Sequence, residues 1–230
     1  MPTLLAIETS TDACSVALSC GNVVQETFVI QPREHNKMLL PMVEEILTGL
    51  RLTVVDLDAI AFGVGPGSFT GLRLSAGVVQ GLAFAANKPV IPISSLAALA
   101  YSAGEPLGIT HSQNILTILD ARMQDIYFAA FRYEPTSLTR LADDALLSTS
   151  QLIDHVKNIS DPVIIGDGWP SDLAMPVNAT KPIATIYPHA KSVLALAKNS
   201  FSTILNACAA LSCCILDLAE SSKAAMLLAI

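Results

Sequence analysis

The sequence predicts an α/β protein built from two related lobes, each with a mixed sheet flanked by helices. Its 230 residues are enough for two small hydrophobic cores. The first half shows three strand-like segments followed by alternating helix-like and strand-like segments. The second half opens in the same way, because an apolar run that ends in an acid occurs at Glu8 and again at Asp120. These observations indicate a duplicated unit whose second copy has diverged.

The first half begins with three predicted antiparallel strands, at residues 4–8, 14–19 and 23–30. Pro32 ends the third strand, because proline cannot donate a hydrogen bond to a neighbouring strand. Apolar residues then recur at helical spacing, which predicts an amphipathic helix over 35–50.

The rest of the first half alternates strands and helices. We expect a strand at 58–64, a glycine-rich turn at 65–71 and a helix rich in small residues at 72–86. A buried strand at 89–93 and a short helix capped by Ser94 follow. The predicted order is therefore three strands, then helix, strand, helix, strand and helix.

The second half repeats this order in shortened form. We expect strands at 115–119, 126–132 and 163–165, and helices at 150–157 and 190–205.

Two predicted lobes follow from this repeat, at residues 1–105 and 106–230. Three antiparallel strands followed by alternating helices and strands are typical of the ribonuclease H-like architecture of the actin and hexokinase type. Two such lobes would enclose a cleft of the kind that binds nucleotides, but a fold alone does not establish a function.

Composition limits the classes of function. Hydrophobic residues make up 52% of the chain and charged residues 14%, so some apolar surface is expected to cover a partner. The net charge of −7 argues against a protein that grips nucleic acid alone, which needs clustered Lys and Arg. We expect a cytoplasmic protein, because no signal-peptide pattern is present. We expect no membrane-spanning helix, because the apolar run at 204–218 is interrupted by polar residues.

No metal site is expected. The histidines, His35, His111, His155 and His189, include no pair three or four residues apart on one helix. The five cysteines are odd in number and form no Cys-x-x-Cys pair, which argues against a disulfide framework or a zinc ribbon.

The strongest local motif is the glycine-rich segment 63–73, between a predicted strand and a predicted helix. Its backbone N–H groups, with Ser68 or Thr70 as the helix cap, could hold an anion. It is not a Walker loop, because no Lys-Ser or Lys-Thr follows the glycines. Alternatively, the glycines only allow a tight turn and close packing of the helix. The sequence leaves both interpretations open.

Glu8 and Asp120 end corresponding strands of the two lobes. Two acids that face each other across a cleft could hold a metal or act as acid and base. Each could instead accept hydrogen bonds from its own turn. The first interpretation predicts an ATP-dependent small-molecule kinase or hydrolase that uses the interlobe cleft. Against it, only Arg73 and Arg122 lie in motifs where they could stabilise a transferred phosphoryl group.

Several short segments also match a known family in order and spacing. They are residues 4–11, 32–35, 65–73, 120–123 and 166–169. Together, over about residues 3–205, they resemble the TsaB (YeaZ) family of tRNA threonylcarbamoyladenosine biosynthesis proteins, which is related to the TsaD-type proteins.

The resemblance implies a non-catalytic dimerisation or scaffold subunit with no independent enzyme activity. It implies a heterodimer with a TsaD-type catalytic subunit, a homodimer when the chain is alone, a TsaE-type ATPase as a further partner, and contact with tRNA only through the complex. It implies no cofactor bound tightly by this chain alone, and it leaves open whether ATP or ADP binds at the interface of the complex.

The resemblance places the partner interface on the helices expected at 35–50 and 70–86, although an amphipathic helix more often serves its own core. The residues expected there are His35, Met38, Leu39, Met42, Thr70, Leu74, Gly77, Val78 and Gly81. A vestigial nucleotide site would comprise Glu8, Thr9, Ser10, Asp120, Arg122, Gly166 and Asp167. No catalytic residue is expected.

From about residue 206 the chain departs from the family, because a Pro-x-Tyr-Leu-Arg-like closing motif is missing and Ala and Cys become frequent. We expect an atypical tail that has diverged or that comes from an altered reading frame.

Overall fold

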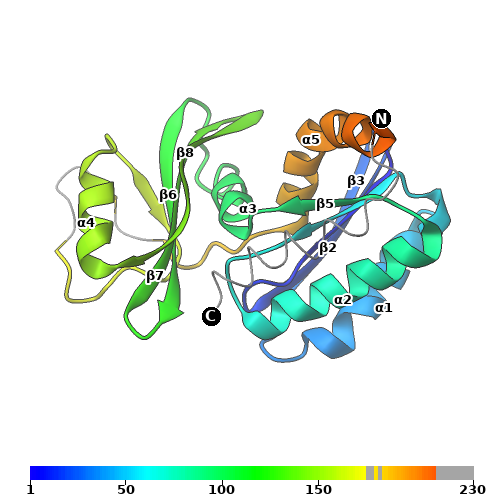
Figure 1. Cartoon of the computed structure of the whole chain (residues 1–230), viewed down its shortest axis with the longest axis horizontal. Helices are drawn as coiled ribbons and strands as arrows, with labels where there is room; N and C mark the ends of the chain where they lie inside the picture. Colours follow the sequence, from blue (N-terminus) through cyan, green and yellow to red (C-terminus); the bar gives the residue numbers. More distant parts are fainter. Residues whose placement is uncertain (175–178, 181–182, 211–230) are drawn as a thin grey trace. The chain divides into compact units, whose positions relative to one another are not determined.

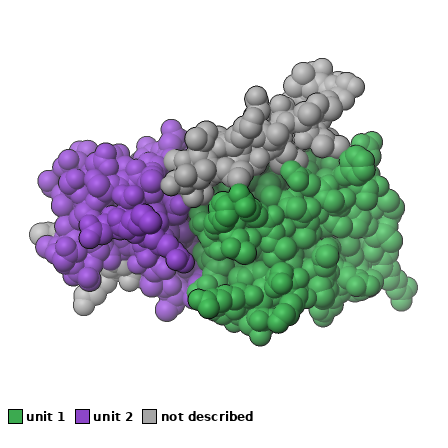
Figure 2. All heavy atoms as spheres, turned by 60° about the horizontal axis from the view of Figure 1, so that its bottom comes forward, with its two compact units in different colours: residues 1–95, 189–230 green, residues 96–188 purple. Residues whose placement is uncertain are grey.

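The computed structural model describes residues 1–174, 179–180 and 183–210, and the side chains of all of these except 202–210. The described chain forms two compact units, which Figure 2 shows in different colours. Unit 1 contains residues 1–95 and the helix that begins after His189, and unit 2 contains residues 96–188. Most of the tail that we expect to be atypical lies outside the described residues.

Unit 1 is built on a five-stranded sheet with the strand order β3-β2-β1-β4-β5. The strands are β1 (Leu4–Glu8), β2 (Ala13–Cys20), β3 (Val23–Ile30), β4 (Ala59–Gly63) and β5 (Val90–Ile93). The first three strands pair antiparallel, and β1, β4 and β5 pair parallel. The expected mixed sheet is therefore confirmed.

Helices cover both faces of this sheet (Figure 1). They are α1 (His35–Gly49), α2 (Phe69–Ala86) and α5 (Ala190–Ala210), and a short 3-10 helix, η1 (Val54–Asp56), precedes β4. Leu5 and Ile7 point to one face, where they join a core with residues of α1 and α2. Ala6 and its strand neighbours Ala17 and Ala61 face the other way, and these small side chains leave room for α5.

Unit 2 is built on a four-stranded sheet with the strand order β8-β7-β6-β9. The strands are β6 (Gln113–Arg122), β7 (Asp125–Glu134), β8 (Ser137–Ser148) and β9 (Val163–Ile165), and the helices are α3 (Ser95–Ser102) and α4 (Thr149–Lys157). The first three strands pair antiparallel and β9 pairs parallel with β6, which repeats the arrangement around β1. On one face of the sheet, Leu152 and Val156 of α4 pack with Phe128. On the other, Tyr101 of α3 packs against Tyr133.

Two features differ from the sequence expectation. The strand β8 was not predicted, because Arg140, Asp143 and Asp144 interrupt its apolar alternation. The expected division at residue 105 is also not the one observed, because α5 packs on the sheet of unit 1 and the chain enters unit 2 soon after β5. A break in the chain rich in Gly and Pro was therefore a poor guide to the boundary between units.

Candidate functional site

Glu8 is buried at the end of β1, with 1% of its surface exposed. One carboxylate oxygen accepts a hydrogen bond from the Ser10 backbone N–H at 2.6 Å, and the other accepts one from the Ser95 hydroxyl at 3.0 Å. Burial raises the pKa of Glu8 above its ordinary value of 4.5, and the hydrogen bonds from Ser10 and Ser95 oppose that shift. Both oxygens of this carboxylate are therefore engaged inside unit 1.

The glycine-rich loop packs directly on the backbone that follows Glu8. The Ser68 N–H donates to the Ser10 carbonyl oxygen at 2.6 Å. A Cβ atom on Gly67 would lie 2.4 Å from that same oxygen, and one on Gly71 would lie 1.9 Å from the Thr9 carbonyl oxygen. These glycines are thus required for close contact between the loop and the turn, as predicted by the interpretation that the glycines serve a tight turn and close packing. At the start of α2, Ser68 caps the helix by accepting from the Gly71 N–H.

Asp120, Arg122, Gly166 and Asp167 lie together at the corresponding strand ends of unit 2. The Asp120 N–H donates to the Asp167 side chain at 3.3 Å, and the Arg122 N–H donates to the Asp120 side chain at 2.7 Å. A Cβ atom on Gly166 would lie 2.1 Å from the Ile118 carbonyl oxygen. Each unit therefore has a glycine loop that packs closely on backbone of its first strand or of the turn that follows it. Each acid accepts a hydrogen bond from the backbone N–H two residues further on, as the alternative interpretation of these acids predicted.

Within the described residues, no group of three or more His, Cys, Asp or Glu side chains could hold a metal ion. His35 at the start of α1 contacts the Ala13 carbonyl oxygen through Nε2 at 3.2 Å, so it anchors the helix to β2. Cys14 and Cys20 are free thiols.

The residues expected at a partner interface fall into three groups. Leu39 and Met42 are buried, at 1% and 4% exposure, in the core of unit 1. Their positions on α1 face the sheet, so they cannot contribute to an outer surface.

The remaining expected residues lie nearer the surface. Met38, Leu74, Val78 and His35 are half-buried, whereas Thr70, Gly77 and Gly81 are exposed. Apart from the neighbouring residues and nearby backbone of α2 itself, no described atom lies within 4 Å of a Cβ built on Gly77 or Gly81. Gly77 and Gly81 therefore form an open stripe along the outer side of α2.

Sequence reasoning missed the large apolar side chains that border this stripe. Phe84 is 75% exposed near the end of α2, and Phe69 is exposed at its start with the Arg73 guanidinium 3.8 Å from its ring centroid. On α1, Leu40 is also exposed. The signal was present in the sequence, because Gly77, Gly81 and Phe84 follow one another at helical spacing.

The helix α2 is also apolar overall. By length and composition alone its 18 residues could cross a membrane, and 22% of them are buried. Ser75, Val79 and Ala83 on its inner side are packed in unit 1. Such a helix equally fits a globular protein whose outer apolar surface is covered by a partner.

Comparison with known proteins identifies the family. A sequence model described as "TsaD: tRNA N6-adenosine threonylcarbamoyltransferase" matches residues 24–228. The chain is 40% identical over 175 residues to the "tRNA threonylcarbamoyladenosine biosynthesis protein TsaB" of Haemophilus influenzae, a match that covers 73% of this chain and 72% of that protein. The protein of the same name from Escherichia coli is 38% identical over 168 residues, which cover 72% and 71% of the two chains.

A solved structure agrees with this match. The structure titled "YeaZ from Pseudomonas aeruginosa" is similar with a TM-score of 0.76 at 35% identity, covering 88% of this chain and 93% of that chain. The identity is spread over most of both chains, so it supports more than a shared fold. The chain belongs to the TsaB (YeaZ) family of tRNA threonylcarbamoyladenosine biosynthesis proteins.

Proposed function

We propose that this chain is the non-catalytic dimerisation and scaffold subunit of the complex that makes N6-threonylcarbamoyladenosine in tRNA. It binds a TsaD-type catalytic subunit through the outer surface of α1 and α2 and forms a homodimer through the same surface when alone. A TsaE-type ATPase joins the complex, which works in the cytoplasm, and tRNA is held by the other subunits.

The observation that carries the interface is the outer side of α2. An open glycine stripe at Gly77 and Gly81 lets a second helix approach closely, and the exposed Phe84 supplies apolar area beside it. Family membership supports this use, because the relatives are named for the same tRNA modification. The net charge of −7 supports a subunit that leaves tRNA to its partners.

The geometry of Glu8 supports the absence of independent catalysis. Its two oxygens accept from Ser10 and Ser95, and the glycine loop is hydrogen-bonded to the same turn. A carboxylate that is buried and hydrogen-bonded on both oxygens by its own chain serves the fold of unit 1.

The test is to mix the purified chain with the TsaD-type subunit of the same organism. We expect a stable complex, measured by size-exclusion chromatography with light scattering, and a reconstituted reaction that yields modified adenosine only when this chain is present. Gly81→Arg should weaken the complex at least about tenfold, because a bulky charged side chain would be forced into the contact between helices.

Asn199→Arg is the matched control, since it adds the same side chain at an exposed position of α5, on the opposite face of the same sheet. Asn199→Arg should melt like the wild type, and Gly81→Arg should not melt below it, because replacing an open helical glycine favours the helix. If the complex forms and Gly81→Arg binds normally, the interface lies elsewhere although the scaffold role stands. If modification proceeds equally well without this chain, the scaffold role itself is wrong.

A further inference from the structure

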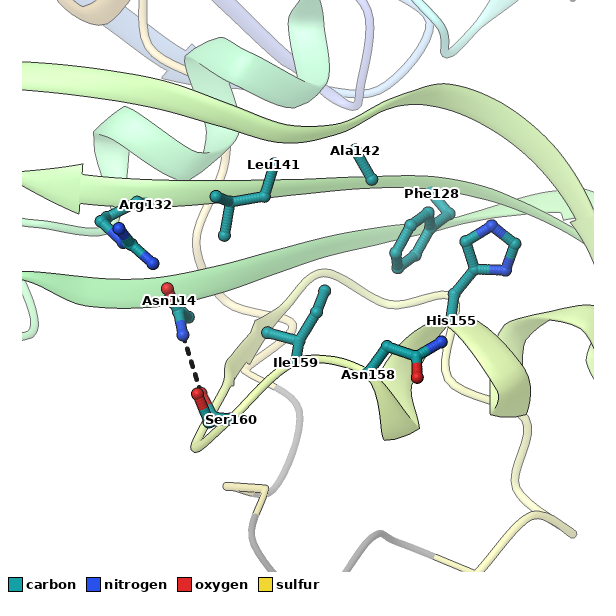
Figure 3. Close-up of a pocket in the computed structure, with 9 residues that line it drawn as sticks. All are labelled: Asn114, Phe128, Arg132, Leu141, Ala142, His155, Asn158, Ile159 and Ser160. Carbon is teal, nitrogen blue, oxygen red and sulfur yellow. Dashed lines mark hydrogen bonds between the residues drawn. The ribbon is translucent and has the colours of Figure 1, made fainter.

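A pocket of about 330 Å³ lies in unit 2, and no residue of the glycine loops or of α2 lines it (Figure 3). It is bounded by β6, β7 and β8, the end of α4 and the turn that follows this helix. Its volume lies at the lower end of the range for small-molecule sites. The lining residues are Asn114, Phe128, Arg132, Leu141, Ala142, His155, Asn158, Ile159 and Ser160.

The pocket exists because α4 is too short to cover its face of the sheet. Its 9 residues span about 14 Å, whereas the 10 residues of β7 span about 33 Å. Leu152 and Val156 of the helix cover Phe128, and the same face continues through Ala130 to Arg132. The chain turns away after α4, and a hollow remains over the uncovered part of β7.

One end of the pocket carries an unpaired positive charge. Arg132 is exposed, and its guanidinium makes no ion pair or hydrogen bond with any residue in the described ranges. The lining contains no carboxylate. Beside it, the Asn114 amide donates to the Ser160 carbonyl oxygen at 2.8 Å, as Figure 3 shows, which leaves the Asn114 side-chain oxygen as an acceptor.

The rest of the pocket is apolar and partly aromatic. Leu141 and Ile159 lie between Arg132 and the Phe128 ring in Figure 3. The His155 ring meets Phe128 edge to face, with 5.3 Å between centroids, and is held there because its Nδ1 donates to the Gln151 carbonyl oxygen at 2.9 Å. A flat apolar group would therefore find both packing area and an aromatic wall.

We propose that this pocket binds a small aromatic carboxylate. The carboxylate lies on the Arg132 guanidinium, whose fork of N–H donors matches its two oxygens. The ring lies over Leu141 and Ile159 and reaches the pair formed by Phe128 and His155. None of the lining residues belongs to α1 or α2, the helices proposed to bind the catalytic subunit.

The test titrates the full-length chain with 4-fluorobenzoate and follows the probe by fluorine NMR. We expect saturable binding to the wild type and at least about tenfold weaker binding to Arg132→Gln, because a charge-assisted pair is lost. Arg132→Lys should lie between the two, because it keeps the charge without the fork. The uncharged probe 4-fluorobenzamide should bind the wild type at least about tenfold more weakly than the carboxylate.

Lys157→Gln is the control variant. Like Arg132→Gln it removes one positive charge, but the charge lies on α4 and outside the pocket lining. It should bind the probe as the wild type does, and all variants should keep the wild-type melting temperature because both side chains are exposed. The proposal is overturned if the wild type shows no saturable binding, if Arg132→Gln binds normally, or if Lys157→Gln loses as much affinity. None of these outcomes depends on the tRNA modification reaction, so the pocket and the scaffold role are tested separately.

Discussion

Gly71→Ala lowers the free energy of unfolding by about 3 kcal/mol or more, whereas Gly77→Ala on the same helix raises it by about 1 kcal/mol. The difference is steric. A Cβ atom on Gly71 would lie 1.9 Å from the Thr9 carbonyl oxygen and 3.1 Å from its carbonyl carbon, and neither backbone atom can rotate away. A Cβ atom on Gly77 would have no described atom within 4 Å apart from neighbouring residues and nearby backbone of its own helix, so only the gain in helix propensity remains.

The measurement is equilibrium unfolding in urea, with each variant compared with the wild type. Gly71→Ala also separates the two interpretations of the glycine-rich motif, because it strains the contact between loop and turn without removing a candidate anion-binding N–H group. If Gly71→Ala were as stable as the wild type, close packing could not explain the glycines, and anion binding would become the better account of the motif.

The strands and helices of unit 1 could be predicted because their periodicity reports burial directly. The residues of β1 up to Ile7 form a continuous apolar run, which indicates a strand buried on both faces, and apolar residues recur every three or four positions in α1, which indicates a helix with one buried face. The sequence could not say whether the glycines after β4 meet a ligand or the chain's own backbone. That depends on Thr9 and Ser10, which approach from β1 only in the folded protein.

Interface residues were harder to predict than core residues. Helical spacing indicated that one side of α1 is apolar, and Leu39 and Met42 were assigned to a partner although that side serves the core of unit 1. The exposed Leu40 and Phe84 were missed because residues on the outer side of a helix do not belong to the pattern that marks its buried face. The spacing of apolar residues therefore identifies the face of a helix that packs on its own core more readily than a face that binds a partner.

The placement of α5 depends on contacts between residues far apart in the chain. The helix was predicted close to its observed start, but nothing local indicates which sheet it covers. The Ala190 N–H donates to the Ser15 hydroxyl at 3.0 Å, and the Lys191 N–H donates to the Glu26 carboxylate at 3.0 Å. These hydrogen bonds join the first turn of α5 to β2 and β3, which were assigned to the other lobe.

Glu26→Gln should therefore destabilise the attachment of α5, by about 2 kcal/mol at neutral pH. Glu26 accepts hydrogen bonds from Ser15 at 2.9 Å and from Lys191, and its second oxygen contacts His189 Nδ1 at 3.1 Å. The negative charge also lies at the N-terminus of α5, where the helix dipole favours it. The His189 ring is stacked on Phe28 with 4.2 Å between centroids, so the contact to Glu26 is held in place.

The effect depends on pH in a defined direction. Burial alone would raise the pKa of Glu26, but hydrogen bonds from His189, Lys191 and Ser15 outweigh it and hold the pKa below its ordinary value of 4.5. A carboxyl whose pKa is lower in the folded than in the unfolded state stabilises the fold fully above the unfolded value. That contribution is lost as the pH falls below 4.5 through the folded value.

The stability difference between the wild type and Glu26→Gln should thus be largest at neutral pH and shrink below pH 4.5. Urea unfolding measures that difference, and hydrogen exchange should show faster opening at the first turn of α5 in the variant than in the wild type. Glu44→Gln, at an exposed position of α1, is the control and should change stability by less than about 0.5 kcal/mol at any pH. If the loss of stability caused by Glu26→Gln stayed constant across the acidic range, the carboxylate charge would not hold α5 in place. Packing of the helix on the face of the sheet that carries Ala6, Ala17 and Ala61 would then be sufficient.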